Sequence, residues 1–444
     1  MTPPVLSPEA SGFGYNGPFG ILPVPYSRGI FNFHWFNLYN AVCFQIVTGP
    51  PTVLLAKELG ANSLTLGVIA SFMPLMTVLQ LPAAHRLGNR GYRSFALLGW
   101  GLRSLFIAVV AAVPLLGCCS QETRLGLLIG GLFLFNLLRG IASAAFLPWI
   151  TGIVPAGIRG RFLALDHTFI NGGFLLAMLF SALLMGGESQ PWRYSLVLLL
   201  ALAFAVISLL CLRRVPDVAC AAGTGLSSAP VALRVMAAFT PFRSYILFNL
   251  VFVTVTGGLG VFPVEYLRVQ AGFSPALIYA LSAGIFLGPM LVLRRFGARV
   301  DRVGSIPVIR ASLLVFAFVL AVWFALSAGI LAPGWKIVLL LNVVGGTALA
   351  LFNLANGHLV MAMVPDRGKN HYFAVATVIG SLGAALSPVA WGWILDALGT
   401  LDIAEGPFHL RRHSVYFLGI CLLSLLALAT SRILREAGGG RSSR

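Results

Sequence analysis

Twelve runs of about 20 predominantly apolar residues divide this chain of 444 residues, and they constrain its fold more than any other feature. The runs begin near residues 30, 62, 94, 125, 167, 194, 244, 274, 306, 337, 371 and 414. An apolar run of this length can cross a bilayer, where backbone polar groups must bond to one another in a helix or a closed barrel. Barrel strands alternate polar and apolar residues, and that pattern is absent here. The runs therefore predict an all-α membrane protein with twelve transmembrane helices.

The composition supports a membrane protein. Hydrophobic residues make up 58% of the chain and charged residues 10%, whereas a soluble domain has about 25% charged residues. The net charge of +17 raises the possibility of a nucleic-acid partner. However, the basic residues lie in short loops between apolar runs, where membrane topology accounts for them. We therefore expect the lipid bilayer as a partner and no nucleic acid.

The basic loop residues are distributed unequally between the two sides of the predicted bundle. The side that holds both termini carries 21 Lys and Arg residues, and the other side carries seven. Those seven are Lys57, Arg124, Arg193, Arg268, Lys336, Arg411 and Arg412. Basic loops stay in the cytoplasm, so we predict that both termini are cytoplasmic. The chain has 27 Arg and three Lys, a bias typical of GC-rich bacterial genomes, which favours the plasma (inner) membrane of a bacterium.

The longest loop divides the chain into two equal sets of helices. Residues 216–240 include AAGTGLSSAP and are predicted to be a cytoplasmic linker between bundles at 29–215 and 241–436. Residues 1–28 lack a basic start followed by an apolar core, so we interpret them as a flexible cytoplasmic tail rather than a signal peptide. Residues 437–444 form a second tail.

The two sets of helices resemble each other at a nearly constant offset. LAKELGANS (55–63) aligns with YLRVQAGFS (266–274), and GIVPAGIRGRFLA (152–164) aligns with AMVPDRGKNHYFA (362–374). HRLGNR (85–90) aligns with DRVGSI (301–306). Three matches in the same order predict a duplicated six-helix unit, so the fold is two pseudo-symmetric bundles. Such bundles around a central pathway are a transporter architecture.

The loop GARVDRVG (297–304) resembles the G-x-x-x-D-R-x-G motif of the major facilitator superfamily (MFS). Gly297, Asp301, Arg302 and Gly304 match it position by position. The resemblance implies a cytoplasmic gate that holds neighbouring helix ends together in the outward-facing state. It also implies a monomer that carries a small-molecule substrate, with or without a coupling ion, between halves that rock about a central site.

The first half has a degraded copy of this motif in LPAAHRLGNR. Leu81 stands in place of the motif's Gly and His85 in place of its Asp, whereas Arg86 fits. We therefore expect the gate to depend more on Asp301 than on His85. RGR at 159–161 and the position of Arg139 also resemble the family.

Polar residues on helices one, seven and ten are candidates for the central site. His34, Asn37, Asn40, Gln45 and Thr48 fall within one arc of the first helix, which favours an interior position because desolvating them against lipid is costly. Helix-to-helix hydrogen bonding without a ligand is the alternative. Of the residues in this arc, Asn37 and Asn40 are the predicted substrate contacts, and Asn249 on helix seven and Asn353 on helix ten are predicted to bind substrate as well.

Two arginines, Arg103 and Arg139, lie near the middle of helices three and four. A charge at that depth costs at least about 2.5 kcal/mol, so it indicates a functional site. The alternative is that they fix packing by bonding to carbonyls and asparagines. With no carboxylate expected at that depth, an anionic or strongly polar substrate is favoured over a cationic one. All 13 acidic residues lie in loops, tails or near helix ends in this interpretation, including Asp166, Glu265 and Asp396.

The motifs of ATP-driven pumps, zinc proteases and serine hydrolases are absent, so we expect no enzyme activity. The six cysteines have no metal-ligand spacing, and we expect no metal or cofactor. The predicted function is secondary active or facilitative transport of a small solute. The alternative is an MFS-like sensor, receptor or assembly scaffold that does not transport.

Overall fold

The computed structural model describes residues 26–85, 91–155, 158–186, 190–218, 239–290, 303–363, 369–399, 401–405 and 408–434, together with 15–16, 23–24 and 292. The helices of the first half are α1 Arg28–Thr48, α2 Pro50–Glu58, α3 Ser63–Thr77, α4 Gln80–His85, α5 Tyr92–Ala112, α6 Gln121–Ala142, α7 Phe146–Ile153, α8 Arg159–Met185 and α9 Pro191–Arg213. Those of the second half are α11 Thr240–Thr256, α12 Phe262–Val269, α13 Pro275–Ser282, α15 Ser305–Ser327, α16 Trp335–Met363, α17 Lys369–Ala397 and α18 Arg412–Thr430. The short turns are η1 Val113–Leu115, η2 Ser143–Ala145 and η4 Ser431–Ile433, and the strands are β1 Tyr15–Asn16, β2 Pro23–Val24, β3 Asp402–Glu405 and β4 Phe408–Arg411.

These helices give the predicted membrane protein. In the described residues, nine helical segments are long and apolar enough to span a membrane, and Ser63–Thr77 and Pro275–Met290 are shorter apolar helices. With α11 and α12, which together lie between α9 and α13, they correspond to the twelve predicted segments. The predicted starts differ mainly where a helix opens on polar residues. For example, α8 begins at Arg159 rather than near 167.

The first segment of each half is broken into two helices. In the first half Gly49 ends α1 and Pro50 begins α2, where a proline without an N–H fits the first helical turn. In the second half Gly257 ends α11, and α12 begins at Phe262 after Gly258, whose φ of 83° favours glycine. The two breaks lie at matching places in the repeat.

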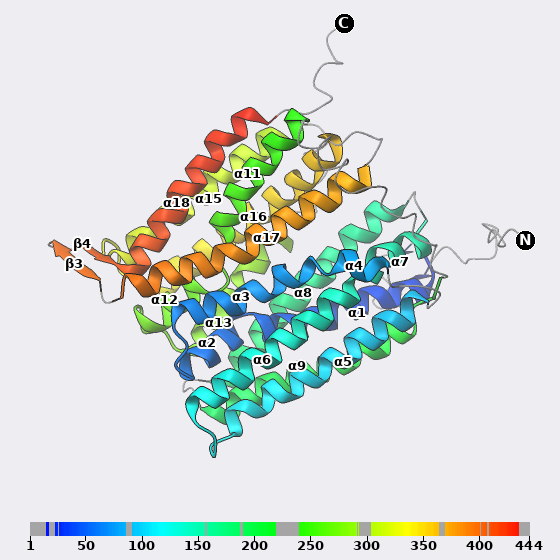
Figure 1. Ribbon diagram of the computed structural model, residues 1–444, viewed down its shortest axis with the longest axis horizontal. Coiled ribbons are helices and arrows are strands. Elements are labelled where there is room, and N and C mark those ends of the chain that lie inside the picture. The colour runs from blue at the N-terminus through cyan, green and yellow to red at the C-terminus, as the bar shows by residue number, and fades with distance from the viewer. Residues whose placement is uncertain are drawn as a thin grey trace, which may run out of the picture.

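Helix packing repeats as well, so the molecule consists of two related bundles (Figure 1). In the first half α1 packs on α8 and α9, and α5 packs on α6 and α9. In the second half α11 packs on α17 and α18, and α15 packs on α16 and α18. The halves meet where α3 packs on α17 and α8 packs on α13, two contacts that the repeat relates to each other.

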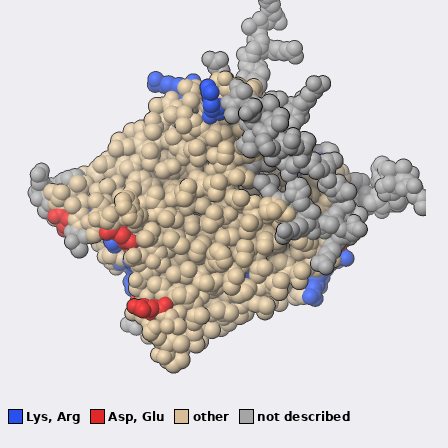
Figure 2. All heavy atoms as spheres, in the orientation of Figure 1, with Lys and Arg blue, Asp and Glu red and all other residues tan. Residues whose placement is uncertain are grey.

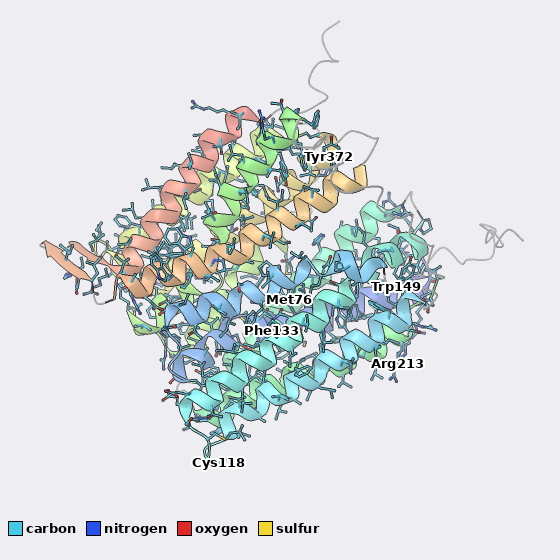
Figure 3. All side chains as sticks on the ribbon, viewed as in Figure 1. Met76, Cys118, Phe133, Trp149, Arg213 and Tyr372 are labelled. Carbon is cyan, nitrogen blue, oxygen red and sulfur yellow. The ribbon has the colours of Figure 1, made fainter. Side chains whose placement is uncertain are left out.

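The bundle has two distinct ends with an apolar surface between them. We call the end that carries α2, α12 and the antiparallel β3–β4 pair the hairpin end, and the end where α1 begins and α18 finishes the terminal end. Figure 3 shows Cys118 at the hairpin end and Arg213 at the terminal end of the same half. In Figure 2 charged groups gather at the ends and a broad uncharged surface separates them, as lipid contact requires.

Several predictions concern residues outside the described ranges. These are most of the linker, at 219–238, the C-terminal tail, and the gate-motif residues Gly297, Asp301, Arg302 and Arg86. Gly304, the last motif position, is described. Its φ of 88° places it in the left-handed region, and it directly precedes α15, so glycine is required for this turn. Tyr26, in the predicted N-terminal tail, is buried and 3% exposed.

Candidate functional site

The polar residues of α1 point into the first half, but they form two groups rather than one. Asn40 faces α5, where its Oδ1 accepts hydrogen bonds from Trp100 Nε1 at 3.0 Å and from Arg103 Nη2. His34 and Asn37 instead face α8 and bond to Asp166. The interior position expected for all three is therefore correct. The separation follows from helix geometry, because residues six apart are turned by about 600°, which leaves His34 and Asn40 on different sides of the helix.

Arg103 is enclosed completely, with an exposed fraction of 0%. Its guanidinium lies over two aromatic rings, with its carbon 5.0 Å from the Trp100 centroid and 4.9 Å from the Phe135 centroid. A desolvated cation–π contact contributes about 2 kcal/mol, and the Asn40 carbonyl adds a charge-assisted bond. Arg103 therefore holds Asn40 in place between α1 and α5.

Arg139 is less enclosed than Arg103. It lies in the last turn of α6, and its guanidinium carbon is 4.6 Å from the centroid of the Phe44 ring on α1. The Phe135 ring that Arg103 contacts stands four residues before Arg139 on α6, so the two cations lie at neighbouring turns of that helix. Neither arginine forms an ion pair with a carboxylate in the described ranges. The structure thus brings two uncompensated positive charges together beside α1.

Several polar atoms of this cluster are buried without a hydrogen-bond partner. They are Nε and Nη1 of Arg103, Nη1 of Arg139 and Oδ1 of Asn136. Asn136 uses its Nδ2 on its own helix, where it donates to the Leu132 carbonyl at 2.9 Å. Unpartnered buried polar atoms are uncommon, because each costs about 1–3 kcal/mol, so they mark a place for water or a ligand. We call Asn40, Arg103, Asn136 and Arg139 the arginine site.

The predicted residues of the second half lie elsewhere. Asn249 on α11 faces α17, since a Cβ added at Gly380 would come within 3.0 Å of its Nδ2. Asn353 on α16 has an exposed side chain. No hydrogen bond links either of them to the arginine site within the described part of the chain. Their predicted contact with a substrate therefore depends on a ligand between the halves.

His34 belongs to a separate buried network. The sequence predicts the interior position of His34 and not its partners. Its Nδ1 lies 2.9 Å from Asp166 Oδ1, and its Nε2 lies 2.5 Å from the hydroxyl of Tyr26. Asn37 Nδ2 donates to both Asp166 oxygens, at 2.8 and 2.9 Å. Asp166 is the eighth residue of α8, about 10 Å from its start at 1.5 Å per residue, so it is not a loop residue.

A second network joins the two halves at the hairpin end. The carboxylate of Glu265 on α12 is fully buried and accepts from Lys57 Nζ at 3.0 Å and from Ser63 Oγ at 3.0 Å, both in the first half. Arg412 Nη2 approaches it at 3.2 Å from its own half. Glu265 therefore lies inside an interface, a position that its place near a helix end did not predict. We call these four residues the hairpin-end gate.

Asp396 strengthens the same junction. Its carboxylate accepts from the backbone N–H of Ser63 at 3.0 Å and of Leu64 at 2.8 Å, which are the first residues of α3. A carboxylate at a helix N-terminus satisfies free amides and the helix dipole. Asp396 lies at the end of α17, as expected, and the structure adds that it caps a helix of the other half. Between described residues of the two halves, all hydrogen bonds and ion pairs lie at this end.

The β3–β4 hairpin lies outside the spanning helices and has its own exposed ion pair. Arg411 Nε donates to Asp402 Oδ2 at 3.2 Å, and His409 Nδ1 lies 3.3 Å from Asp402 Oδ1. The hydrogen bond from Arg411 holds the pKa of Asp402 below its ordinary value, and His409 acts in the same direction.

Two repeated six-segment bundles with buried charge beside a discontinuous helix define a polytopic membrane protein of transporter architecture. The family model of the Major Facilitator Superfamily matches residues 35–300. The chain therefore belongs to the major facilitator superfamily of membrane transporters, as the gate motif suggested.

The individual relatives share the fold at low sequence identity. A D-xylose-proton symporter has a TM-score of 0.71 at 17% identity, over 92% of this chain and 97% of that one. The xylose transporter XylE from E. coli has a TM-score of 0.65 at 16% identity, over 93% and 96% of the two chains. The nucleoside transporter NupG has a TM-score of 0.61 at 13% identity, over 92% and 100%.

One curated relative matches in sequence over a short stretch. The major myo-inositol transporter IolT of Bacillus subtilis (strain 168) is 31% identical over 97 residues. That stretch covers 21% of this chain and 20% of the relative, so it supports the family and leaves the substrate open.

Proposed function

We propose that this protein is a secondary transporter that moves a small anionic or strongly polar solute by alternating access, with the arginine site as its contact point. The observation that carries the proposal is the pair formed by the enclosed Arg103 and the partly buried Arg139. Both have buried N–H groups without a hydrogen-bond partner and no described carboxylate to compensate them. A guanidinium bonds a carboxylate or phosphate through two parallel N–H groups. The solute would supply the missing charge.

The roles of the two arginines differ because their exposure differs. Arg103 is fully enclosed and occupied by Asn40, so it positions Asn40 and adds positive field. Arg139 lies over Phe44 at the side of α1, has a free N–H, and is not fully enclosed. Arg139 is thus the group that touches the solute. Asn249 and Asn353 would complete the site from the second half.

The proposed orientation follows from the basic loops. With 21 of the loop cations on the side of the termini, the terminal end faces the cytoplasm and the hairpin end faces outward in a bacterial inner membrane. The hydrogen-bonded hairpin end then corresponds to an outwardly closed state. Transport requires this end to open, which the contacts of Glu265 and Asp396 would control.

A neutral polyhydroxylated solute is the second candidate. It is favoured by the relatives, whose names specify xylose, nucleosides and myo-inositol. Arginine and asparagine side chains also donate to hydroxyl groups, so the same site would serve it.

A ligand-stabilisation screen of the purified protein separates these candidates. The set comprises small carboxylates, phosphate esters, sugars, nucleosides and organic cations, each tested for a rise in melting temperature. We expect an anion to stabilise the wild-type protein and to have no effect on Arg139→Ala. Arg139→Lys should recover only part of the shift in melting temperature, because lysine keeps the charge and lacks the two parallel N–H donors of the guanidinium. The exposed Arg161→Ala is the matched control and should behave as wild type. An organic cation as best ligand, or normal stabilisation of Arg139→Ala, would overturn the anion assignment.

A further inference from the structure

A second buried polar cluster in the first half, separate from the arginine site, has the composition of a proton-binding site. It consists of His34 and Asn37 on α1, Asp166 on α8, and Tyr26 just before α1. The imidazole of His34 is fully buried, and the side chain of Asp166 is 10% exposed. The transport site described above uses none of these four residues.

Aromatic rings enclose the imidazole. The ring centroid of His34 lies 4.4 Å from that of Phe162 and 5.4 Å from those of Phe31 and Phe169. Such walls exclude water from His34, so its ring nitrogens must bond within the protein. They do so in a single chain, from Tyr26 through His34 to Asp166.

This chain accepts one added proton without moving a heavy atom. With a neutral imidazole, Nδ1–H donates to Asp166 and Nε2 accepts from the Tyr26 hydroxyl. When a proton binds to Nε2, the imidazolium donates at both nitrogens and the Tyr26 oxygen becomes the acceptor. One N–H bond forms, and the hydroxyl hydrogen only rotates. Both protonation states are therefore satisfied by the same geometry.

An added proton also changes the net charge of this enclosure. Without it, Asp166 is a lone carboxylate whose partners, Asn37 and a neutral imidazole, carry no charge. With it, His34 and Asp166 form an ion pair of zero net charge at 2.9 Å. Burying an unpaired charge costs far more than burying a hydrogen-bonded pair.

Within the described residues, no other charged side chain forms a hydrogen bond or ion pair with His34 or Asp166. One further titratable side chain, that of Tyr26, is hydrogen-bonded to this pair through His34. Arg159, at the start of α8, is engaged with the carbonyls of Thr151 and Val154 instead. α9, the other helix packed on α1, contributes no hydrogen bond or ion pair to His34 or Asp166.

The position of the cluster connects it to the contacts between the halves. α8 packs on α13 of the second half, and α1 leads through Gly49 into α2, which carries Lys57 of the hairpin-end gate. Gly173 of α8 lies so close to α1 that an added Cβ would be 2.4 Å from the Leu38 carbonyl. A change of charge between α1 and α8 therefore acts on two elements that reach the other half.

We propose that the His34–Asp166 pair binds a proton, taken up through the exposed edge of Asp166, and that this proton is the coupling ion of transport. The proposal rests on the proposed transport function, and its first test needs no solute.

The probe is the proton itself, and the readout is the distance across the hairpin end. Spin-label amino acids replace the exposed Glu122 and Lys336, one in each half, and pulsed electron resonance is recorded at about pH 5 and about pH 8, between which histidine changes charge. We expect the distance distribution of the otherwise wild-type chain to differ between the two values. Asp166→Asn and His34→Gln should abolish the difference. The exposed neighbour His167→Gln should retain it.

Tyr26→Phe is a further variant, because it removes the second hydrogen-bond partner and leaves the carboxylate in place. It should displace the pH response to another pH range, and it keeps the proposal testable if the other variants fail to fold. A wild-type distribution that is equal at both pH values, or a response that persists in Asp166→Asn and His34→Gln, would overturn the proposal.

Proteoliposomes separate the proton site from the transport function. Uptake of the solute found by stabilisation, driven by a pH gradient, should be lost in Asp166→Asn while exchange of internal for external solute continues. An intact pH response without any uptake would refute transport and leave the proton site. Gradient-driven uptake that is normal in Asp166→Asn would refute the proton site and leave transport.

Discussion

Gly67 offers a direct test of the hairpin-end junction, because it lies where α3 meets α17 of the other half. A Cβ at this position would lie 2.2 Å from the carbonyl oxygen of Pro388 and 2.8 Å from its carbon. Both are backbone atoms, so no side chain can rotate away to make room. In Gly67→Ala the two halves must therefore move apart at this end.

The magnitude follows from the cost of overpacking. An extra methyl group in a close-packed contact destabilises it by about 1–3 kcal/mol. The contact joins the two halves, so the cost falls on the state closed at the hairpin end and is relieved when that end opens. The ratio of closed to open molecules should therefore fall by about 5- to 150-fold.

Two other glycines provide matched controls. A Cβ at Gly346 of α16 would lie 2.2 Å from the carbonyl oxygen of Ile285, but this contact is within the second half. Gly346→Ala should lower the melting temperature and leave the balance between open and closed states unchanged. Gly126→Ala, where a Cβ meets nothing within 4 Å, should have neither effect.

The assay is the distance across the hairpin end, measured with spin labels at positions 122 and 336. The expected result is a longer-distance population in Gly67→Ala that is absent in both controls. If Gly67→Ala gave the wild-type distribution, or if Gly346→Ala gave an equal shift, the junction would not be the contact that opens.

Three further predictions concern the cap that Asp396 forms on α3, the β3–β4 hairpin and the cytoplasmic loop motif at 297–304. Asp396→Ala removes a cap worth about 1 kcal/mol from α3, so the ratio of closed to open molecules should fall about fivefold in the same distance measurement. An unchanged distribution would show that the cap does not hold the halves together. The lowered pKa of Asp402 means that its pair with Arg411 stabilises the hairpin above the ordinary aspartate range and is lost as pH falls through the lowered pKa. Acid should therefore lower the protection of the β3–β4 amides, measured as their exchange rate relative to the intrinsic rate at the same pH, and Asp402→Asn should show low protection at every pH. Asp301→Asn should slow transport and favour inward-facing states more than His85→Ala does, and equal effects would remove the asymmetry between the two motifs.

Much of the fold could be predicted from the sequence, because bilayer thickness fixes the length of an apolar run and the repeat fixes the pairing of halves. The start of α8 was missed because its first turns contain Arg159, Arg161 and Asp166, which interrupt the apolar pattern. The breaks in α1 and α11 also went unpredicted, although Gly49 and Pro50 are a strong local signal.

The sequence predicted which residues form the candidate site better than it predicted their hydrogen-bond partners. Arg103, Arg139 and the asparagines of α1 stand out because polar groups are costly at membrane depth. Their partners are distant in the chain, as with His34 and Asp166, which are 132 positions apart. Helical periodicity specifies the side of its own helix on which a residue lies, and it carries no information about the neighbouring helix. For this reason the sequence did not predict the contacts of Glu265 and Asp396, because both carboxylates bond to residues of the opposite half.

Uptake into proteoliposomes tests the central claim most directly, namely that Arg139 binds a solute that the protein carries across the membrane. The labelled solute is the compound that best stabilises the purified wild-type protein. We predict saturable uptake by the wild-type protein and by Arg161→Ala. Arg139→Ala, inserted at equal density and monodisperse, should lose at least about tenfold in apparent affinity, because a hydrogen bond to a charged group contributes about 1.5–3 kcal/mol. Full uptake by Arg139→Ala, or no uptake by folded wild-type protein, would contradict the account.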